Sequence, residues 1–110
     1  MPIYMYQFSY TSESWAAQLK APQDRIEAVG RPLCEAAGGR LIGGWYCFGD
    51  YDVVVIAEMP DNESMTALAL AIGAGGAVKG GKTTVLMSGT EGVSGMTKAA
   101  ATAKSYRPAR

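Results

Sequence analysis

The side chains of this chain that could transfer a proton are carboxylates, phenols, lysines and thiols, because its 110 residues include no histidine. Without histidine the chain lacks Ser-His and Cys-His nucleophile pairs, His-ligated metal sites and the usual general base. Two acids, Asp52 and Glu58, bracket the apolar run Val53 to Ala57, so either carboxylate could face an apolar cavity and act as a base. Asp52 and Glu58 are therefore the candidate catalytic residues. Alternatively, Asp52 follows a turn and accepts hydrogen bonds from backbone donors there.

Aromatic side chains alternate along the first apolar run, Ile3 to Tyr10, where every second residue of a strand points to the same face. We call these four residues the aromatic row: Tyr4, Tyr6, Phe8 and Tyr10. The row could pack against a second sheet as an interface, or it could line a pocket for a flat apolar ligand. Three residues of the row and two aromatic residues of the central region are the candidate ligand-binding residues: Tyr4, Tyr6, Phe8, Trp45 and Tyr51.

Metal and cofactor sites are not indicated by the remaining residues. Cys34 and Cys47 are thirteen positions apart, form no CxxC motif and have no histidine nearby to complete a metal site. Two buried thiols are expected rather than a redox pair. The glycine-rich stretch Gly73 to Gly81 lacks the GxxxxGK[ST] spacing of a phosphate-binding loop, so it is expected to be a flexible connection. We expect neither a metal nor a cofactor.

The elements that must position these residues are organised around Leu41 to Met59. Two strand-length apolar runs there flank the turn-forming residues Gly49 and Asp50, a pattern that predicts an antiparallel hairpin. Before the hairpin, the sequence predicts the first strand, a helix capped by Thr11 or Ser12, and a second helix.

The second helix runs from Pro22 to about Ala37 and should be kinked near Gly30, where Pro32 also disturbs it. After the hairpin come a helix from about Asn62 to Ile72 and a last strand, Lys82 to Met87. The resulting βαββαβ order is that of a ferredoxin-like α+β fold, with helices on one face of an antiparallel sheet.

Charges are unevenly distributed along a chain whose net charge is zero. Residues 1–78 carry four bases and nine acids, whereas residues 79–110 carry six bases and one acid. We divide the chain into a domain over residues 1–88 and a flexible basic C-terminal tail over residues 89–110, in which Met96 to Tyr106 could form a short helix on a partner. The tail is too sparsely basic for a nucleic-acid patch, and no membrane span or signal peptide is indicated. A cytoplasmic location is expected, without nucleic acid or membrane as partner.

The run Gly49-Asp50-Tyr51-Asp52-Val53-Val54-Val55, followed by Glu58 and Pro60-Asp61, resembles the signature of GYD-domain proteins. The opening MPIY and the pair Gly38-Gly39 before the second strand are also similar to that family. The resemblance covers about residues 1–88. It implies a dimeric α/β barrel type of protein, a homo-oligomer whose sheets pair face to face. The family has no well-defined general activity, so the resemblance implies a fold and an assembly rather than a reaction.

Three functions remain open at this stage. The first is an oligomeric protein that binds a small apolar or aromatic molecule; by analogy with cofactor-free monooxygenases and lactone isomerases of the wider barrel group, it could also carry proton-transfer or oxygenase-like activity. The second is a non-enzymatic assembly or scaffold module that uses the aromatic row and the basic tail. The third is a tautomerase with Pro2 as its N-terminal proline, although Pro22 breaks the expected helix and Arg25 and Arg31 fall on its outer side.

Overall fold

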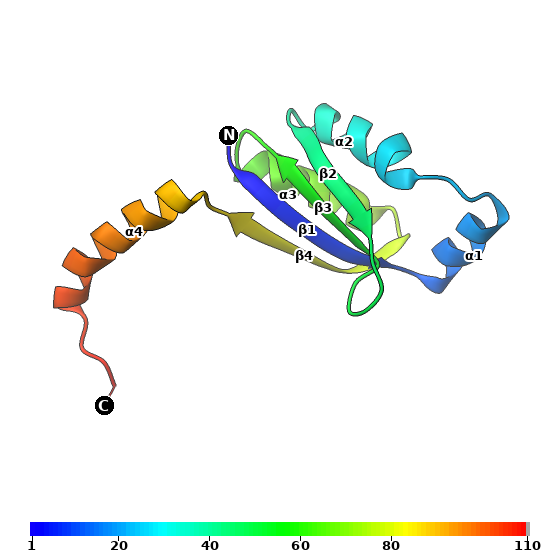
Figure 1. The fold of residues 1–110 in the computed structure, drawn as a ribbon. Coiled ribbons are helices and arrows are strands. Elements are labelled where there is room, and N and C mark those ends of the chain that lie inside the picture. Colours follow the sequence, from blue (N-terminus) through cyan, green and yellow to red (C-terminus); the bar gives the residue numbers. More distant parts are fainter. Residues whose placement is uncertain (110) are drawn as a thin grey trace.

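The computed structural model describes residues 1 to 109 and consists of one four-stranded antiparallel sheet with helices packed on one of its faces (Figure 1). The strands are β1 (Ile3–Tyr10), β2 (Arg40–Tyr46), β3 (Val53–Glu58) and β4 (Val78–Leu86). Their order across the sheet is β2-β3-β1-β4, so β1 and β3 are central while β2 and β4 form the edges. The predicted α+β, ferredoxin-like arrangement is confirmed.

The helices begin largely where capping residues predict them. They are α1 (Ser12–Lys20), α2 (Arg31–Ala36), α3 (Asn62–Ala74) and α4 (Gly89–Thr102), with a π-helical turn (Ile26–Gly30) before α2 and a 3₁₀ turn (Ala103–Ser105) after α4. Thr11 Oγ1 accepts a hydrogen bond from Ser14 N–H at the start of α1. The Asp61 carboxylate accepts one from Ser64 N–H at the start of α3, and this bond lowers the pKa of Asp61.

The second helical region is shorter than predicted and irregular where an irregularity was expected. It begins at Ile26 rather than Pro22, and the π-helical turn ends at Gly30. Pro32 lies in the first turn of α2, which continues directly from the π-helical turn, so it has no N–H to donate to the preceding turn.

The aromatic row lies on the sheet face that the helices cover, and all four of its side chains are buried. Successive rings are in contact, with centroids 5.5 Å apart for Tyr6 and Phe8 and 5.3 Å apart for Phe8 and Tyr10. The row continues into α1, since the ring centroids of Tyr10 and Trp15 are 5.1 Å apart. The interpretation of this row as a sheet-to-sheet interface is therefore wrong, because the chain's own helices occupy that face.

The opposite side of the sheet, which we call the open face, has no element of residues 1–109 packed over it (Figure 1). On this face, Trp45 of β2 is the cross-strand neighbour of Val54 on β3, and Met5 of β1 is that of Ile56 on β3. Apolar side chains therefore lie next to each other on three strands. The Trp45 indole lies over Gly43, where a β-carbon would be 3.0 Å from the ring, and the residue Trp45 is 57% exposed. The open face therefore presents apolar surface to solvent.

Both edge strands are irregular. The pairing of β2 with β3 shifts register between Leu41 and Gly43, and the pairing of β1 with β4 shifts between Gln7 and Ser9. On β4, Gly80 has a φ of +64°, which favours glycine. This strand begins at Val78, earlier than predicted, so most of the expected glycine-rich connection belongs to α3 and β4.

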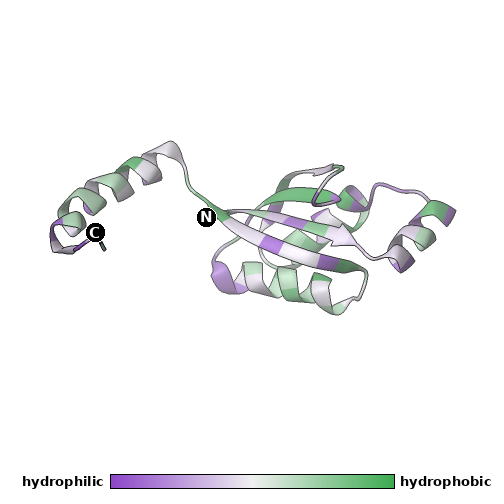
Figure 2. Cartoon of the chain, turned by 90° about the horizontal axis from the view of Figure 1, so that it is seen from below, coloured by the Kyte–Doolittle hydropathy of each residue, from purple (hydrophilic) through white to green (hydrophobic). Residues whose placement is uncertain are grey.

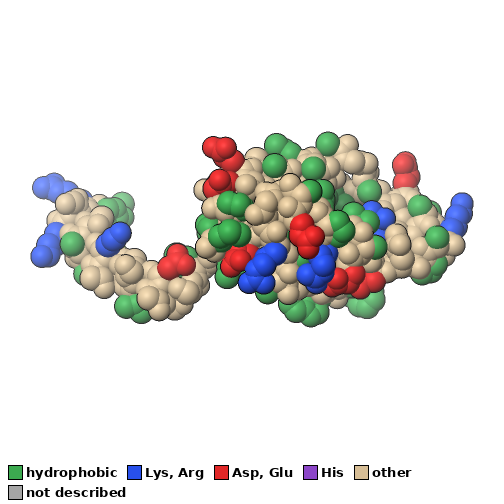
Figure 3. Space-filling model, turned by 90° about the horizontal axis from the view of Figure 1, so that it is seen from above, with side chains coloured by type: hydrophobic (Ala, Val, Ile, Leu, Met, Phe, Trp, Pro, Cys, Tyr) green, Lys and Arg blue, Asp and Glu red, His purple; other side chains and the backbone are tan. Residues whose placement is uncertain are grey.

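The C-terminal segment is helical where the sequence predicts a flexible tail with a short helix from Met96 to Tyr106. The α4 helix starts earlier, at Gly89, after a cap in which Ser88 Oγ accepts a hydrogen bond from Glu91 N–H. It projects away from the sheet, whereas α3 lies against it (Figures 1 and 2). Lysine and arginine side chains gather toward its far end (Figure 3). A domain boundary at residue 88 stays a prediction.

Candidate functional site

An apolar cavity of about 290 Å³ lies between the helical layer and the sheet. Its floor is formed by Phe8 and Tyr10 of the aromatic row, together with valines of β3, and its walls come from the π-helical turn, α2 and α3. Small-molecule sites are concave, mostly apolar and carry a few polar groups. This cavity has that composition.

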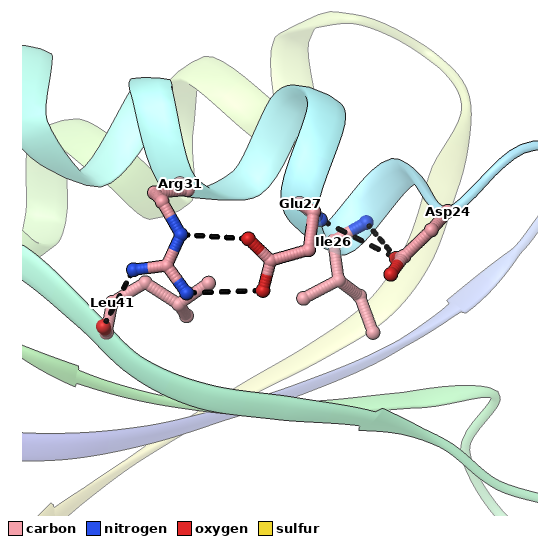
Figure 4. A network of polar contacts seen from close by, with 5 residues as sticks. All are labelled: Asp24, Ile26, Glu27, Arg31 and Leu41. Atoms are coloured by element: carbon pink, nitrogen blue, oxygen red, sulfur yellow. Dashed lines mark hydrogen bonds and ion pairs between the residues drawn. The ribbon is translucent and has the colours of Figure 1, made fainter.

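The wall over β2 is held in place by a set of polar contacts shown in Figure 4. Asp24 Oδ1 accepts hydrogen bonds from Ile26 N–H (3.0 Å) and Glu27 N–H (3.3 Å), which satisfies donors at the start of the π-helical turn. Arg31 forms a two-pronged ion pair with Glu27 and also donates to the carbonyl oxygen of Leu41 on β2 (3.3 Å). These contacts join the helical wall to the edge strand.

Arg25, Tyr10 and Tyr46 form a polar group at the margin of the cavity. The Arg25 backbone N–H donates to the Tyr46 hydroxyl (3.1 Å), and both Arg25 and Tyr10 line the cavity. Burial raises the pKa of Tyr10, and Tyr46 and Asp52 raise it further, while the Arg25 guanidinium acts in the opposite direction by stabilising the phenolate. Arg25 and Tyr10 thus supply the polar groups at this margin of the cavity.

A second, more polar hollow of about 470 Å³ lies beside the cavity, between α1 and the end of α3. Arg25, Gly75 and Ala77 line both spaces. The hollow also includes Glu13 and Thr11 at the start of α1. The apolar cavity and the polar hollow thus meet at Arg25.

The predicted ligand-binding residues do not come together. Phe8 lines the cavity, whereas Tyr4 lies farther along the row and donates a hydrogen bond from its hydroxyl to Asn62 Oδ1. Tyr6 is next to Gly81 on β4, where a β-carbon would be 2.7 Å from its hydroxyl oxygen. Trp45 is on the open face, and Tyr51 is in the hairpin loop, where its carbonyl oxygen accepts a hydrogen bond from Cys47 Sγ (3.1 Å).

Asp52 connects three parts of the fold. Its Oδ2 accepts hydrogen bonds from Tyr10 N–H (2.9 Å) and from Trp15 Nε1–H (3.3 Å), and its own N–H donates to the carbonyl oxygen of Phe8 (3.0 Å). Its carbonyl oxygen accepts from Cys47 N–H (2.8 Å), which closes a hairpin loop longer than the tight turn predicted at Gly49 and Asp50. The Asp52 carboxylate thus accepts a backbone hydrogen bond, but the donor is Tyr10 on β1 and not a residue of the turn, where we expected it. Its catalytic role stays a prediction.

Glu58 lies at the other end of β3 from Asp52, on the same open face as its cross-strand partner Arg40. Its carboxylate is 2.9 Å from Arg40 Nε. The two predicted acids are therefore separated by the length of a strand and do not form one site. The catalytic assignment of Glu58 also stays a prediction.

Sequence reasoning missed Arg25 and Tyr46 as site residues and counted Tyr10 only as part of the row. Arg25 was expected on the outer side of a helix, but it immediately precedes the π-helical turn and lines two cavities. The one available signal was the pair Asp24-Arg25 before an apolar helical stripe, because an aspartate there can cap the turn and fix its neighbour.

Both cysteines are free thiols, and Cys34 lines the cavity. Burial raises the pKa of the Cys34 thiol. Cys47 is partly exposed, contrary to the expectation that both thiols are buried.

Among residues 1–109, no three His, Cys, Asp or Glu side chains are grouped as metal ligands. Over the same residues, every helix falls short of the length and apolar content that crossing a membrane requires.

Comparison with known proteins identifies similarity at two levels. The family model of the GYD domain matches residues 4–104, a range that passes residue 88 and includes α4. Among curated proteins, no sequence match was found. Among solved structures, FFRP-DM1 aligns with 79% of this chain and 100% of its own length, at 10% identity and a TM-score of 0.54.

Two further structures are similar. MtbAldR aligns with 79% of this chain at 14% identity and a TM-score of 0.59, and the aligned region spans 52% of that protein's length. The protein TTHA0845 from Thermus thermophilus aligns with 80% of this chain and 95% of its own, at 16% identity and a TM-score of 0.51. At these identities the similarity establishes the fold alone.

Proposed function

The chain belongs to the GYD-domain family, and on that premise we propose that it is a homo-oligomeric protein that binds a small apolar molecule in the cavity between its sheet and helices. The observation that carries the proposal is the composition of that cavity. Its floor and walls are aromatic and aliphatic, and a volume of about 290 Å³ lies near the lower end of the range for small-molecule sites.

Binding is tested by filling the cavity with a larger side chain. Leu68 is buried, lines the cavity and belongs to α3, so Leu68→Phe should place a ring into the space. Leu70→Phe is the matched control, because Leu70 is on the same helix and 67% exposed. The probe is 1-hexanol, followed by amide chemical shifts. Wild type and Leu70→Phe should bind it at residues that line the cavity, and Leu68→Phe should lose that binding. Identical titrations of all three proteins would contradict the proposal.

The proposed homo-oligomer would form through the open face of the sheet. A central strand with apolar side chains on both faces needs cover on both, and only the face with the aromatic row is covered within the described residues 1–109. A second copy of the chain would bury Trp45, Val54 and Ile56.

The assembly is tested by placing a charge on that face. Ile56→Arg should shift the protein to monomer in light scattering coupled to size-exclusion chromatography. Leu19→Arg, on the exposed side of α1, should leave the oligomer unchanged. An intact Ile56→Arg oligomer would remove the open face from the interface.

A non-enzymatic assembly module is the second candidate, favoured by the exposed apolar residues Val93 and Met96 on the projecting α4 helix. Native mass spectrometry separates the two functions. An oligomer with retained small-molecule mass supports ligand binding. An oligomer that neither retains a molecule nor binds the probe supports assembly alone.

A further inference from the structure

We propose that Arg25 makes the cavity selective for amphipathic acids: small molecules with an apolar body and one anionic group, such as a carboxylate. The inference rests on the proposed ligand-binding function and specifies the chemical class of ligand. The apolar body would lie over Phe8 and Val55, and the anionic group would lie at the cavity margin against the Arg25 guanidinium and the Tyr10 hydroxyl.

The first argument is the charge distribution of the cavity lining. Arg25 is the one charged residue among the described residues that line this cavity. A cation at an otherwise apolar wall is costly to desolvate unless an opposite charge accompanies it. A ligand anion would supply that charge.

The second argument is the absence of an internal partner. Within residues 1–109, no carboxylate lies within 4.0 Å of Arg25, whereas Arg31 pairs with Glu27 at 2.7 Å and Arg40 pairs with Glu58 at 2.9 Å. Arg31 and Arg40 are thus committed to structural contacts. Arg25 retains the planar set of donors that matches a carboxylate in a bidentate arrangement.

The third argument is that the backbone around Arg25 is fixed before any ligand arrives. Its N–H is bound to the Tyr46 hydroxyl, and the next two N–H groups are bound by Asp24. A guanidinium carried on a fixed backbone loses less conformational freedom when it binds an anion. Tyr10 lines the same cavity, and its hydroxyl would supply a neutral donor to the anion.

The neighbouring hollow limits where the anion can lie. Glu13 lines that hollow and would repel an anion held there, whereas it does not line the apolar cavity. The anionic group is therefore placed on the cavity side of Arg25, between it and Tyr10. The alternative orientation, with the acid in the hollow, places two negative charges in one space.

The test compares two probes that share an apolar body. Hexanoate carries a carboxylate and 1-hexanol a neutral hydroxyl, and each is titrated into wild type, Arg25→Gln and Arg107→Gln by isothermal calorimetry. Wild type should bind hexanoate at least about tenfold more tightly than 1-hexanol, as a charge-assisted contact predicts. Arg25→Gln should lose that preference and still bind 1-hexanol, which also shows that the variant is folded. Arg107→Gln, at an exposed arginine outside the cavity, should behave as wild type.

The outcomes separate this inference from the function on which it rests. Equal binding of the two probes by wild type, or a hexanoate preference that survives in Arg25→Gln, overturns the selectivity and leaves cavity binding in place. Failure of wild type to bind either probe overturns both. A hexanoate preference that Leu68→Phe abolishes together with 1-hexanol binding supports both.

Discussion

Ile26 and Gly44 are in direct contact between the helical layer and the sheet: a β-carbon at position 44 would lie 2.7 Å from Ile26 Cγ2 and 3.0 Å from Val55 Cγ1. Glycine is needed there because the π-helical turn rests on the backbone of β2. Any larger residue at this position would push the cavity wall away from the strand.

Gly44→Ala should therefore lower the free energy of unfolding by about 1 to 3 kcal/mol, the usual cost of overpacking a core. Urea denaturation followed by circular dichroism gives the value. Gly73→Ala is the control, because a β-carbon at Gly73 in α3 meets no atom within 4 Å, and it should raise stability by about 0.5 to 1 kcal/mol. A Gly44→Ala protein as stable as wild type would show that the turn can lift without cost.

Asp52→Ala should detach α1 from the end of β1. The change leaves Tyr10 N–H and the Trp15 indole N–H without their acceptor, and unpaired donors of this kind cost about 1 to 3 kcal/mol. Tryptophan fluorescence and urea denaturation should report a more exposed Trp15 and a less stable protein. The neighbouring Asp50→Ala is the control, since the backbone carbonyl with which Asp50 accepts a hydrogen bond from Ser9 is retained in that variant. Unchanged stability with lost turnover of a substrate would instead support the catalytic role of Asp52.

Stability should fall at alkaline pH through Tyr6. Burial raises the pKa of Tyr6 above its ordinary value, so the folded state holds the phenolic proton more tightly than the unfolded state does. The resulting stabilisation is fully present below the unfolded-state pKa of about 10 and is lost as pH rises through the folded-state pKa. Tyr6→Phe should therefore flatten the decline in unfolding free energy between pH 9 and pH 11, a window of roughly one pH unit on either side of the unfolded-state pKa. Tyr106→Phe, at an exposed position, should leave the decline unchanged.

Removal of residues 89–110 tests the boundary predicted at residue 88. The apolar side chains of α4 are exposed and the helix projects from the sheet, so the truncated protein should keep its unfolding free energy within about 0.5 kcal/mol. Urea denaturation of both lengths at one protein concentration makes the comparison. A loss well above that value would extend the domain into α4, in line with the family match to residue 104.

The alternation of Tyr4, Tyr6, Phe8 and Tyr10 was sufficient to place these residues on one face, because strand geometry has a period of two. The alternation was not sufficient to determine which face of the sheet the helices cover. In β3, Val53 and Val55 point to one side while Val54 and Ile56 point to the other, so both sides are apolar and either could have received the helices.

The position of Arg25 shows a different limit of prediction from sequence. Its position followed from a π-helical turn and a cap by Asp24, and the extra residue in such a turn changes the helical phase on which a face assignment depends. The contacts of Asp52 with Tyr10 and Trp15 join residues about forty positions apart, which no local pattern predicts.

The register shifts in β2 and β4 determine how the sheet can grow. A regular edge strand offers a straight line of backbone donors and acceptors that another chain can extend, whereas a bulge interrupts that line. Both edges of this sheet are interrupted, and on β4 the interruption lies between Lys79 and Lys82, whose charges repel an identical strand. Addition of strands side by side into a continuous ribbon is therefore disfavoured at both edges, which supports the proposal that copies of this chain associate face to face.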